Sequence, residues 1–164
     1  MEPRARGLAG QIADANTLSA SVKAYLASHT WHPRRCDDTV MTLVLIAVGG
    51  AAGAVSRYLT QGWVEEFTGG RFPWGTFVVN ISGSFFLGVV FALAIDRAVL
   101  APEVRVPLMI GFISSYTTFS TLMLESWRLI EEGDMLFALG NLVGSIIVGM
   151  IAVVAGLALG RYLA

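Results

Sequence analysis

The sequence predicts an all-α membrane protein with four transmembrane helices. Hydrophobic residues make up 55% of the 164 residues and charged residues only 14%, whereas a soluble domain usually has about 25% charged residues. The apolar residues also come in four long runs, each near the length of about 20 residues that a helix needs to cross a bilayer. The net charge of −1 gives no basic surface of the kind that a nucleic-acid partner would require.

The first forty residues form a region of their own. Residues 1–40 are polar and mixed in charge, and they contain no apolar run long enough for a signal peptide. The pattern favours at most a weak helix over 12–27. Because Met41 opens the first apolar run, we hypothesise that it is the true start and that 1–40 is a gene-calling artefact. The alternative is a poorly ordered cytoplasmic tail. Residues 41–164 are predicted to form the four-helix domain.

The four apolar runs define the predicted membrane helices, and short loops between them hold most of the charged residues. Trp63, Trp74 and Trp127 lie near the ends of these runs, where amphipathic rings favour the membrane interface. None of the four ranges contains Asp or Glu. Since proton-coupled pumps and cation antiporters usually carry an intramembrane carboxylate, a drug-like cation is not the expected permeant species. The helices are predicted over residues 41–59, 74–95, 106–124 and 135–159.

Three residue types that are common in catalytic sites, namely Cys, Lys and His, are confined to the first region. The only Cys, the only Lys and both His lie before residue 41. Residues 41–164 therefore have no side chains for disulfides, for zinc binding through Cys or His, or for Cys- or His-based catalysis. The predicted spans also hold no titrating acid, base or nucleophile pair, so we do not expect an enzyme.

Arginine is distributed almost evenly between the two ends of the predicted bundle. Arg97, Arg105 and Arg161 fall on one side, and Arg71 and Arg128 fall on the other. Under the positive-inside rule, so small a difference gives almost no preferred orientation. A chain that inserts both ways can form an antiparallel homodimer. The alternative is that the insertion machinery still selects one orientation, which basic residues before the first span would favour.

Two predicted helices carry polar residues at helical spacing. Thr76, Asn80 and Ser84 are four residues apart and share one face of the second span, and Asn141 and Ser145 form a similar pair in the fourth. A single intramembrane amide is explained by a hydrogen bond between helices, which is common in membrane bundles. Two polar lines on two helices favour a wet pathway more strongly. Glycines at the same spacing indicate close helix packing instead.

The third span has seven hydroxyl residues between Ser114 and Thr121. Ser and Thr side chains compete with the helical hydrogen bonds, so a run of this kind can sit within a helix that is broken in the middle of the membrane. Non-helical backbone at this depth of the membrane is tolerated only inside protein or beside a cavity, and its free carbonyl oxygens can bind a cation. Phe119 interrupts the run. An aromatic ring has a positive edge, which favours a small anion without binding it too tightly for conduction.

Arg57 lies near the end of the first span, after a glycine-rich stretch. It is explained equally by a side chain that extends to the membrane interface and by an electropositive entrance that concentrates anions. The residues alone leave both interpretations open.

Three segments of the chain together resemble the CrcB/Fluc fluoride channels. They read GGAAGAVSRY from Gly49, GTFVVNISGSFFLG from Gly75 and GFISSYTTFST from Gly111, and the resemblance covers residues 41–164. It implies an antiparallel homodimer of four-helix subunits in the bacterial inner membrane. It also implies passive export of fluoride through two pores, which gives fluoride resistance.

The resemblance also assigns roles to single residues. It implies a structural sodium ion at the dimer axis, held by the backbone carbonyls of Ser114 and Thr117. It places Arg57 at a vestibule. The residues that it places along the fluoride pathway are Asn80 and Phe119 in the pore, Thr76, Ser120 and Thr121 beside it, and Asn141 and Ser145 on a polar track of the fourth helix.

Three residues depart from the family pattern. Leu122 replaces a second pore phenylalanine, Ser114 replaces a glycine that tolerates unusual backbone angles better, and Asn141 replaces a tyrosine found in some members. These departures indicate either subtype variation or a subunit that works only with a second homologue, as a heterodimer.

Two other functions are alternatives to a fluoride channel. A small four-helix multidrug transporter would have a carboxylate in its first span, and residues 41–59 contain none. A non-conducting accessory subunit would explain the glycines but not the run of hydroxyls. The sequence therefore favours a fluoride channel.

Overall fold

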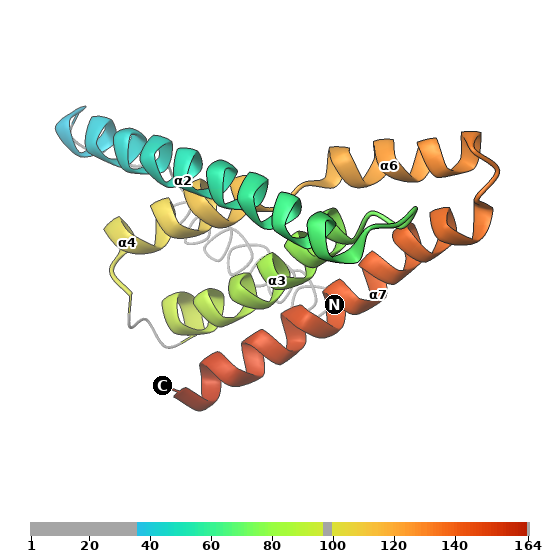
Figure 1. Cartoon of the computed structure of the whole chain (residues 1–164). Helices are drawn as coiled ribbons and strands as arrows, with labels where there is room; N and C mark the ends of the chain where they lie inside the picture. The colour runs from blue at the N-terminus through green and yellow to red at the C-terminus, as the bar shows by residue number, and fades with distance from the viewer. Residues whose placement is uncertain (1–35, 97–99, 164) are drawn as a thin grey trace, which may run out of the picture. The chain divides into compact units, whose positions relative to one another are not determined.

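The computed structural model describes residues 36–96 and 100–163. Within these two ranges the chain is helical apart from short turns and contains no strand. Asp37–Ala164 form one compact unit, whose helices are labelled in Figure 1. The weak helix that the sequence favours over 12–27 lies outside the described residues.

Helices follow one another in the order that the sequence predicts. Four segments of the described chain are long and apolar enough to cross a membrane, namely Thr39–Thr68, Trp74–Ile95, Glu103–Glu131 and Met135–Leu163. The prediction of an all-α chain with four membrane-spanning helices is thereby confirmed. The elements are α2 (Cys36–Thr68), α3 (Trp74–Phe91), η1 (Ala92–Asp96), α4 (Pro102–Val106), η2 (Pro107–Ile113), α5 (Ser114–Tyr116), α6 (Phe119–Glu131) and α7 (Met135–Leu163), where η marks a π-helix.

The helices continue beyond the predicted spans where the chain becomes polar. The first segment ends at Thr68 rather than at 59, and the third ends at Glu131 rather than at 124. The longer helices also contain Glu65, Glu66, Glu103, Glu125 and Glu131, all of which lie outside the spans predicted from the sequence. Charged residues do not end these helices. The turns that follow them contain Gly69 (φ 38°) and Gly133 (φ 83°), a backbone conformation that favours glycine.

Helices α3 and α7 lie side by side along much of their length (Figure 1). A Cβ atom at Gly88 would overlap the carbonyl oxygen of Val153, and one at Gly156 would overlap that of Phe85. Gly53 of α2 meets the backbone of η2 in the same way. Close backbone contact at small residues is typical of membrane helices, as the glycine spacing predicts.

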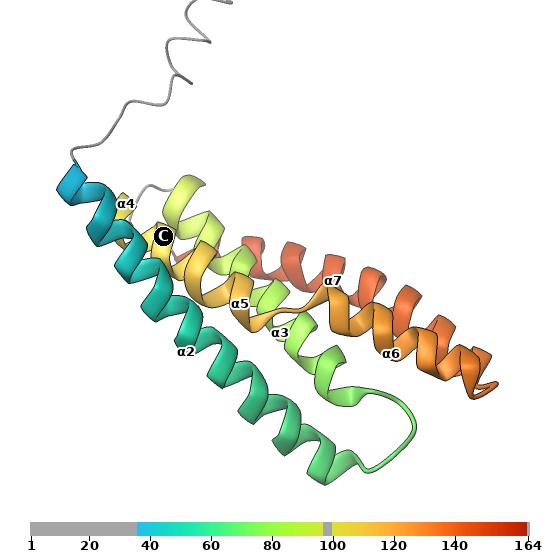
Figure 2. The ribbon, with the colours of Figure 1, turned by 90° about the horizontal axis from the view of Figure 1, so that it is seen from above.

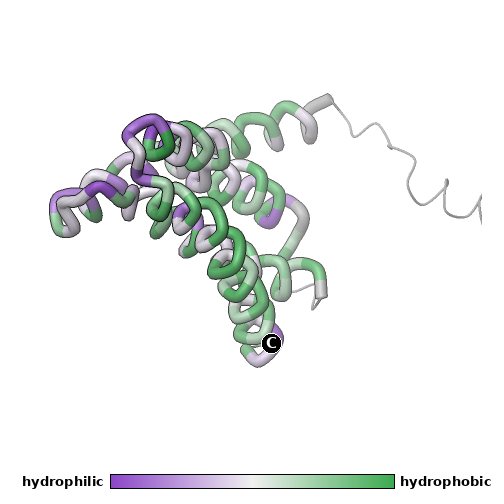
Figure 3. The backbone as a smooth tube through the Cα atoms, turned by 90° about the vertical axis from the view of Figure 1, so that its right-hand side faces the viewer, coloured by the Kyte–Doolittle hydropathy of each residue, from purple (hydrophilic) through white to green (hydrophobic). Residues whose placement is uncertain are grey.

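Several of the most deeply buried side chains of the unit are polar, and many large apolar side chains lie on its outside. The largest fully buried side chains are Val79, Asn141, Thr76 and Ser126, three of which are polar. Large apolar side chains are exposed instead, above all on α2 and α7, and hydrophobic residues dominate the helices in Figure 3. This arrangement suits a chain surrounded by lipid, in which polar groups must find their partners inside the protein.

Candidate ion pathway

A groove of about 290 Å³ lies between α3, the segment from η2 to α6, and α7. None of the residues that line it, all of them within the described ranges, is charged. Arg57 is half-buried on α2 and does not line this groove. The groove brings together predicted residues from three parts of the sequence, namely Asn80, Ser84, Ser114, Thr117, Phe119 and Ser145.

Helices α5 and α6 are separated by Thr117 and Thr118, which are here called the α5–α6 junction. Thr117 (φ −85°, ψ 158°) and Thr118 (φ −149°, ψ 115°) both have extended backbone, and the ribbon between α5 and α6 in Figure 2 is not helical. Thr118 is the N-cap of α6, because its Oγ1 accepts a hydrogen bond from the N–H of Thr121 (3.3 Å). Its hydroxyl also bonds the Thr121 hydroxyl (2.9 Å).

Asn80 of α3 bonds both backbone groups of Thr118. Its Nδ2 donates to the Thr118 carbonyl (3.0 Å), and its Oδ1 accepts from the Thr118 N–H (2.8 Å). In a continuous helix this N–H would donate to the Ser114 carbonyl. The Thr117 carbonyl likewise does not receive the N–H of Thr121, which donates to Thr118 Oγ1. The two carbonyls predicted to hold a cation therefore both lack the partner that a continuous helix would supply.

Thr76 lies in a second polar cluster, apart from the groove. Its Oγ1 accepts a hydrogen bond from Gln61 Nε2 (2.9 Å) and donates to Glu125 Oε1 (2.7 Å). The hydroxyl hydrogen of Thr76 is therefore engaged, and Glu125 Oε2 is buried without a hydrogen-bond partner in the described chain. Sequence reasoning missed Gln61 and Glu125. The spacing of four residues from Thr121 to Glu125 was the available signal.

Asn141 and Ser145 face inward from α7. Asn141 Nδ2 donates to Ser126 Oγ (3.0 Å), and that hydroxyl donates to the Leu122 carbonyl (2.7 Å). Within the described part of the chain, Asn141 Oδ1 and Ser145 Oγ are buried without a partner, and each such atom costs about 1–3 kcal/mol. Ser126 was not predicted, since nothing in its own sequence context distinguishes it from the other hydroxyl residues.

Phe119 and Ser120 lie on the outside of the chain at the start of α6. Phe119 lines the groove but is 72% exposed, and Ser120 is exposed as well. Leu122 is only 5% exposed and also lines the groove. A single chain therefore leaves most of the Phe119 ring uncovered.

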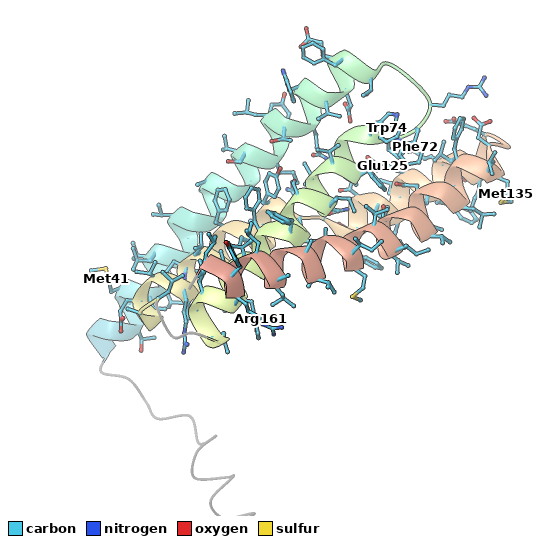
Figure 4. All side chains as sticks on the ribbon, turned by 90° about the horizontal axis from the view of Figure 1, so that it is seen from below. Met41, Phe72, Trp74, Glu125, Met135 and Arg161 are labelled. Carbon is cyan, nitrogen blue, oxygen red and sulfur yellow. The ribbon has the colours of Figure 1, made fainter. Side chains whose placement is uncertain are left out.

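Charged and aromatic residues meet where the α2–α3 loop approaches the α6–α7 turn. Arg71 Nη1 lies 3.1 Å from both carboxylate oxygens of Asp134, and the rings of Phe72 and Trp74 are 4.6 Å apart. Figure 4 labels Phe72, Trp74 and Glu125 close to one another at this end. A cavity of about 160 Å³ opens here, lined by Arg71, Pro73, Glu125, Arg128, Leu129 and Glu132.

Metal binding by side chains is not supported in the part of the chain that the structure describes. No group of three or more His, Cys, Asp or Glu residues there could hold a metal ion. The cation ligands predicted from the family pattern are of another kind, namely the backbone carbonyls of Ser114 and Thr117.

Comparison with known proteins identifies the family of the chain. Residues 44–157 match the family described as "CrcB-like protein, Camphor Resistance (CrcB)". "Fluoride-specific ion channel FluC" of Hahella chejuensis is 46% identical over 75% of this chain and 97% of that protein. "Fluoride-specific ion channel FluC 1" of Symbiobacterium thermophilum is 49% identical over 73% of this chain and 98% of that protein. The "Fluoride-specific ion channel FluC" of Geotalea daltonii is 39% identical over 76% of this chain and 100% of that protein. The chain is a multi-pass membrane protein that belongs to the CrcB family.

Proposed function

We propose that this chain is a fluoride-specific ion channel that passes cytoplasmic fluoride out of the cell passively and so gives fluoride resistance. Its relatives named as fluoride-specific ion channels support this function. The observation that carries the proposal is a groove beside the α5–α6 junction that has no charged lining residue and in which Asn80, Ser84 and Ser145 lie among apolar side chains. On this proposal the protein is a channel and not an enzyme.

Fluoride is small and strongly hydrated, so a pathway for it must replace water with hydrogen-bond donors. Asn80 has a second amide hydrogen that Thr118 does not take, and Ser145 Oγ has no partner in the described chain. The positive ring edge of Phe119 adds a weak attraction for an anion. Because no cation lines the groove, the ion is not held too tightly to leave. We include Thr76, Ser120, Thr121 and Asn141 in the pathway on the family pattern, and Arg57 at its vestibule.

The working unit is proposed to be an antiparallel homodimer, with the third membrane helix broken in mid-membrane at the α5–α6 junction. Phe119 supports a partner at this face, because its side chain is 72% exposed and Ile146, which lines the same groove, is 65% exposed. The even distribution of arginine supports insertion in both orientations. A heterodimer with a second homologue is the alternative, since Leu122 gives this chain one pore phenylalanine instead of two.

A structural sodium ion is proposed at the dimer axis. The backbone carbonyls of Ser114 and Thr117 suit it, because neither receives its usual helical N–H and because oxygen ligands bind hard cations. When bound, the ion supplies a fixed positive charge that links the two subunits. The backbone carbonyls of Ser114 and Thr117 would hold it, and both residues also line the groove, whereas conduction is proposed to use the side chains of Asn80, Phe119 and Ser145.

The location proposed for the channel is the inner membrane of the cell. There it contacts lipid through the apolar side chains of α2 and α7. The four-helix domain is taken as 41–164, with 1–40 as a separate extension.

One observation favours a different class of transporter. A multidrug-type carrier binds its cation through a membrane carboxylate, and Glu125 lies within the third candidate span. Glu125 does not line the groove, however, and one of its oxygens accepts a hydrogen bond from Thr76. The channel therefore remains the better-supported function.

The test is fluoride efflux from liposomes that contain only this purified chain, measured with a fluoride electrode. Chloride efflux from the same liposomes is the matched control. Fast release of fluoride without chloride supports a homodimeric channel. Absence of release from folded protein contradicts it, and renewed release after co-reconstitution with a second homologue from the same genome would identify a heterodimer.

A further inference from the structure

Among the predicted pathway residues, Asn80 is the one whose side chain bonds the backbone of the α5–α6 junction directly. Its amide pairs with the N–H and the carbonyl of Thr118 at 2.8 and 3.0 Å, much as one strand pairs with another. The two residues are 38 positions apart in the sequence. Thr118 is only 7% exposed, so water cannot easily replace this pair of bonds.

The pairing decides between two conformations of the chain. The Thr118 N–H can donate to Asn80 Oδ1, as it does here, or to the Ser114 carbonyl, as in a continuous helix. It cannot fully satisfy both acceptors. Occupation by Asn80 therefore favours the extended junction and leaves the Ser114 carbonyl without that donor.

Neighbouring contacts hold α5 against the same stretch of α3. Ser82 Oγ lies 3.0 Å from the Tyr116 hydroxyl oxygen, and the Tyr116 ring stacks on that of Phe112 with centroids 6.1 Å apart. A Cβ atom at Gly83 would overlap the Thr117 side chain. The junction is thus fixed on its N-terminal side by Tyr116 and at its centre by Asn80.

We infer that Asn80 is a positioning residue, which holds the α5–α6 junction extended by taking the Thr118 N–H away from the Ser114 carbonyl. This inference rests on the proposed function, because it explains how the pathway and the cation site are kept in shape together. On this inference, Asn80 Oδ1 and one Nδ2 hydrogen are both bonded to the Thr118 backbone. Only the second Nδ2 hydrogen remains for an ion.

Hydrogen–deuterium exchange at the Thr118 amide tests the inference without any measurement of flux. Full-length protein in lipid nanodiscs is compared with Asn80→Ala, Asn80→Asp and Ser145→Ala. Asn80→Ala removes the acceptor. The Thr118 N–H then either loses its bond and exchanges about tenfold faster, or moves to the Ser114 carbonyl, so that the carbon chemical shifts of Thr118 change from extended to helical values. Asn80→Asp keeps an acceptor oxygen and should retain slow exchange. Ser145→Ala changes the same groove without touching the junction and is the matched control.

The change in exchange rate is expected only at the α5–α6 junction. Exchange along α7 should stay as in the unmodified protein in all three variants, which separates loss of this bond from general destabilisation. Unchanged exchange at Thr118 in Asn80→Ala, together with carbon chemical shifts that remain extended, would overturn the inference, as would equally fast exchange in Asn80→Asp. If Asn80→Ala does not fold, Asn80→Ser replaces it with the same expectation, because a serine is too short to reach both backbone groups.

The result is independent of the liposome assay. If the unmodified chain releases no fluoride but Asn80→Ala still accelerates exchange at Thr118, the positioning role stands and the proposed function fails. If fluoride is released while neither the exchange nor the carbon chemical shifts of Thr118 change in Asn80→Ala, the function stands and the positioning role fails.

Discussion

The two faces of α3 are held by different kinds of contact. Toward α7, Gly88 meets the backbone around Gly156 so closely that neither position has room for a Cβ atom. Toward the α5–α6 junction, Asn80 and Ser82 form hydrogen bonds with residues whose backbone or hydroxyl groups would otherwise lack partners. In lipid, such groups must be satisfied within the protein. The contact with α7 therefore stabilises the fold, whereas the contact with the junction shapes the proposed ion pathway. We expect substitutions on the first face to lower stability and substitutions on the second to lower fluoride efflux.

The largest expected effect is on conduction and comes from Phe119→Ile. Isoleucine has no positive ring edge, so fluoride efflux should fall to the leak of protein-free liposomes. Because Phe119 is 72% exposed in the chain, the fold should be retained, and gel filtration should show the same oligomer. The matched control is Phe86→Ile, which changes an exposed ring of α3 outside the groove and should leave efflux unchanged. Near-normal efflux in Phe119→Ile would contradict the role of the ring edge.

Gly156→Ala tests the scaffold face. The new methyl group would overlap the carbonyl oxygen of Phe85, and a backbone atom cannot move aside as a flexible side chain can. We expect a loss of about 3 kcal/mol, the upper part of the usual range for overpacking, measured as a lower temperature of unfolding in detergent. Gly140→Ala is the control, since its nearest neighbour would be Phe72 at an ordinary distance of 3.8 Å. Equal stability of the two variants would mean that α3 and α7 are less closely packed than described.

The scaffold was easier to predict from the sequence than the pathway. The second span was predicted over 74–95 and is observed at Trp74–Ile95, because Pro73 precedes it and charged residues follow it. The sequence did not predict the partners of Glu125. Its side chain accepts a hydrogen bond from Thr76 of α3, which in turn accepts one from Gln61 of α2. Such a partnership depends on three helices meeting in space. The same holds for Asn80, whose polarity was visible in the sequence while its partner Thr118 was not.

Ser126→Ala tests the polar interior beyond the groove. The change leaves the Asn141 amide buried without its only bonded partner in the described chain, so we expect a loss of about 2 kcal/mol in stability. Ser120→Ala removes a similar hydroxyl from an exposed position of the same helix and should change stability by less than about 0.5 kcal/mol. Thermal unfolding of both variants at one lipid and detergent composition gives the comparison. An effect of Ser120→Ala as large as that of Ser126→Ala would show that burial does not set the contribution of these hydroxyls.

Arg71→Ala should have the smallest effect, although Arg71 joins the α2–α3 loop to the α6–α7 turn. Its guanidinium lies 3.1 Å from the Asp134 carboxylate, but 71% of the arginine side chain is exposed. Water and salt weaken an exposed ion pair, so the loss should be about 0.5 kcal/mol or less and should shrink further as sodium chloride is raised. The Phe72 and Trp74 rings remain in contact without it, and they keep the loop in place. Thermal unfolding at low and high salt checks this, with Arg71→Lys as the charge-preserving control. A loss of several kcal/mol in both salts would show that this edge, rather than the α3–α7 contact, stabilises that end of the bundle.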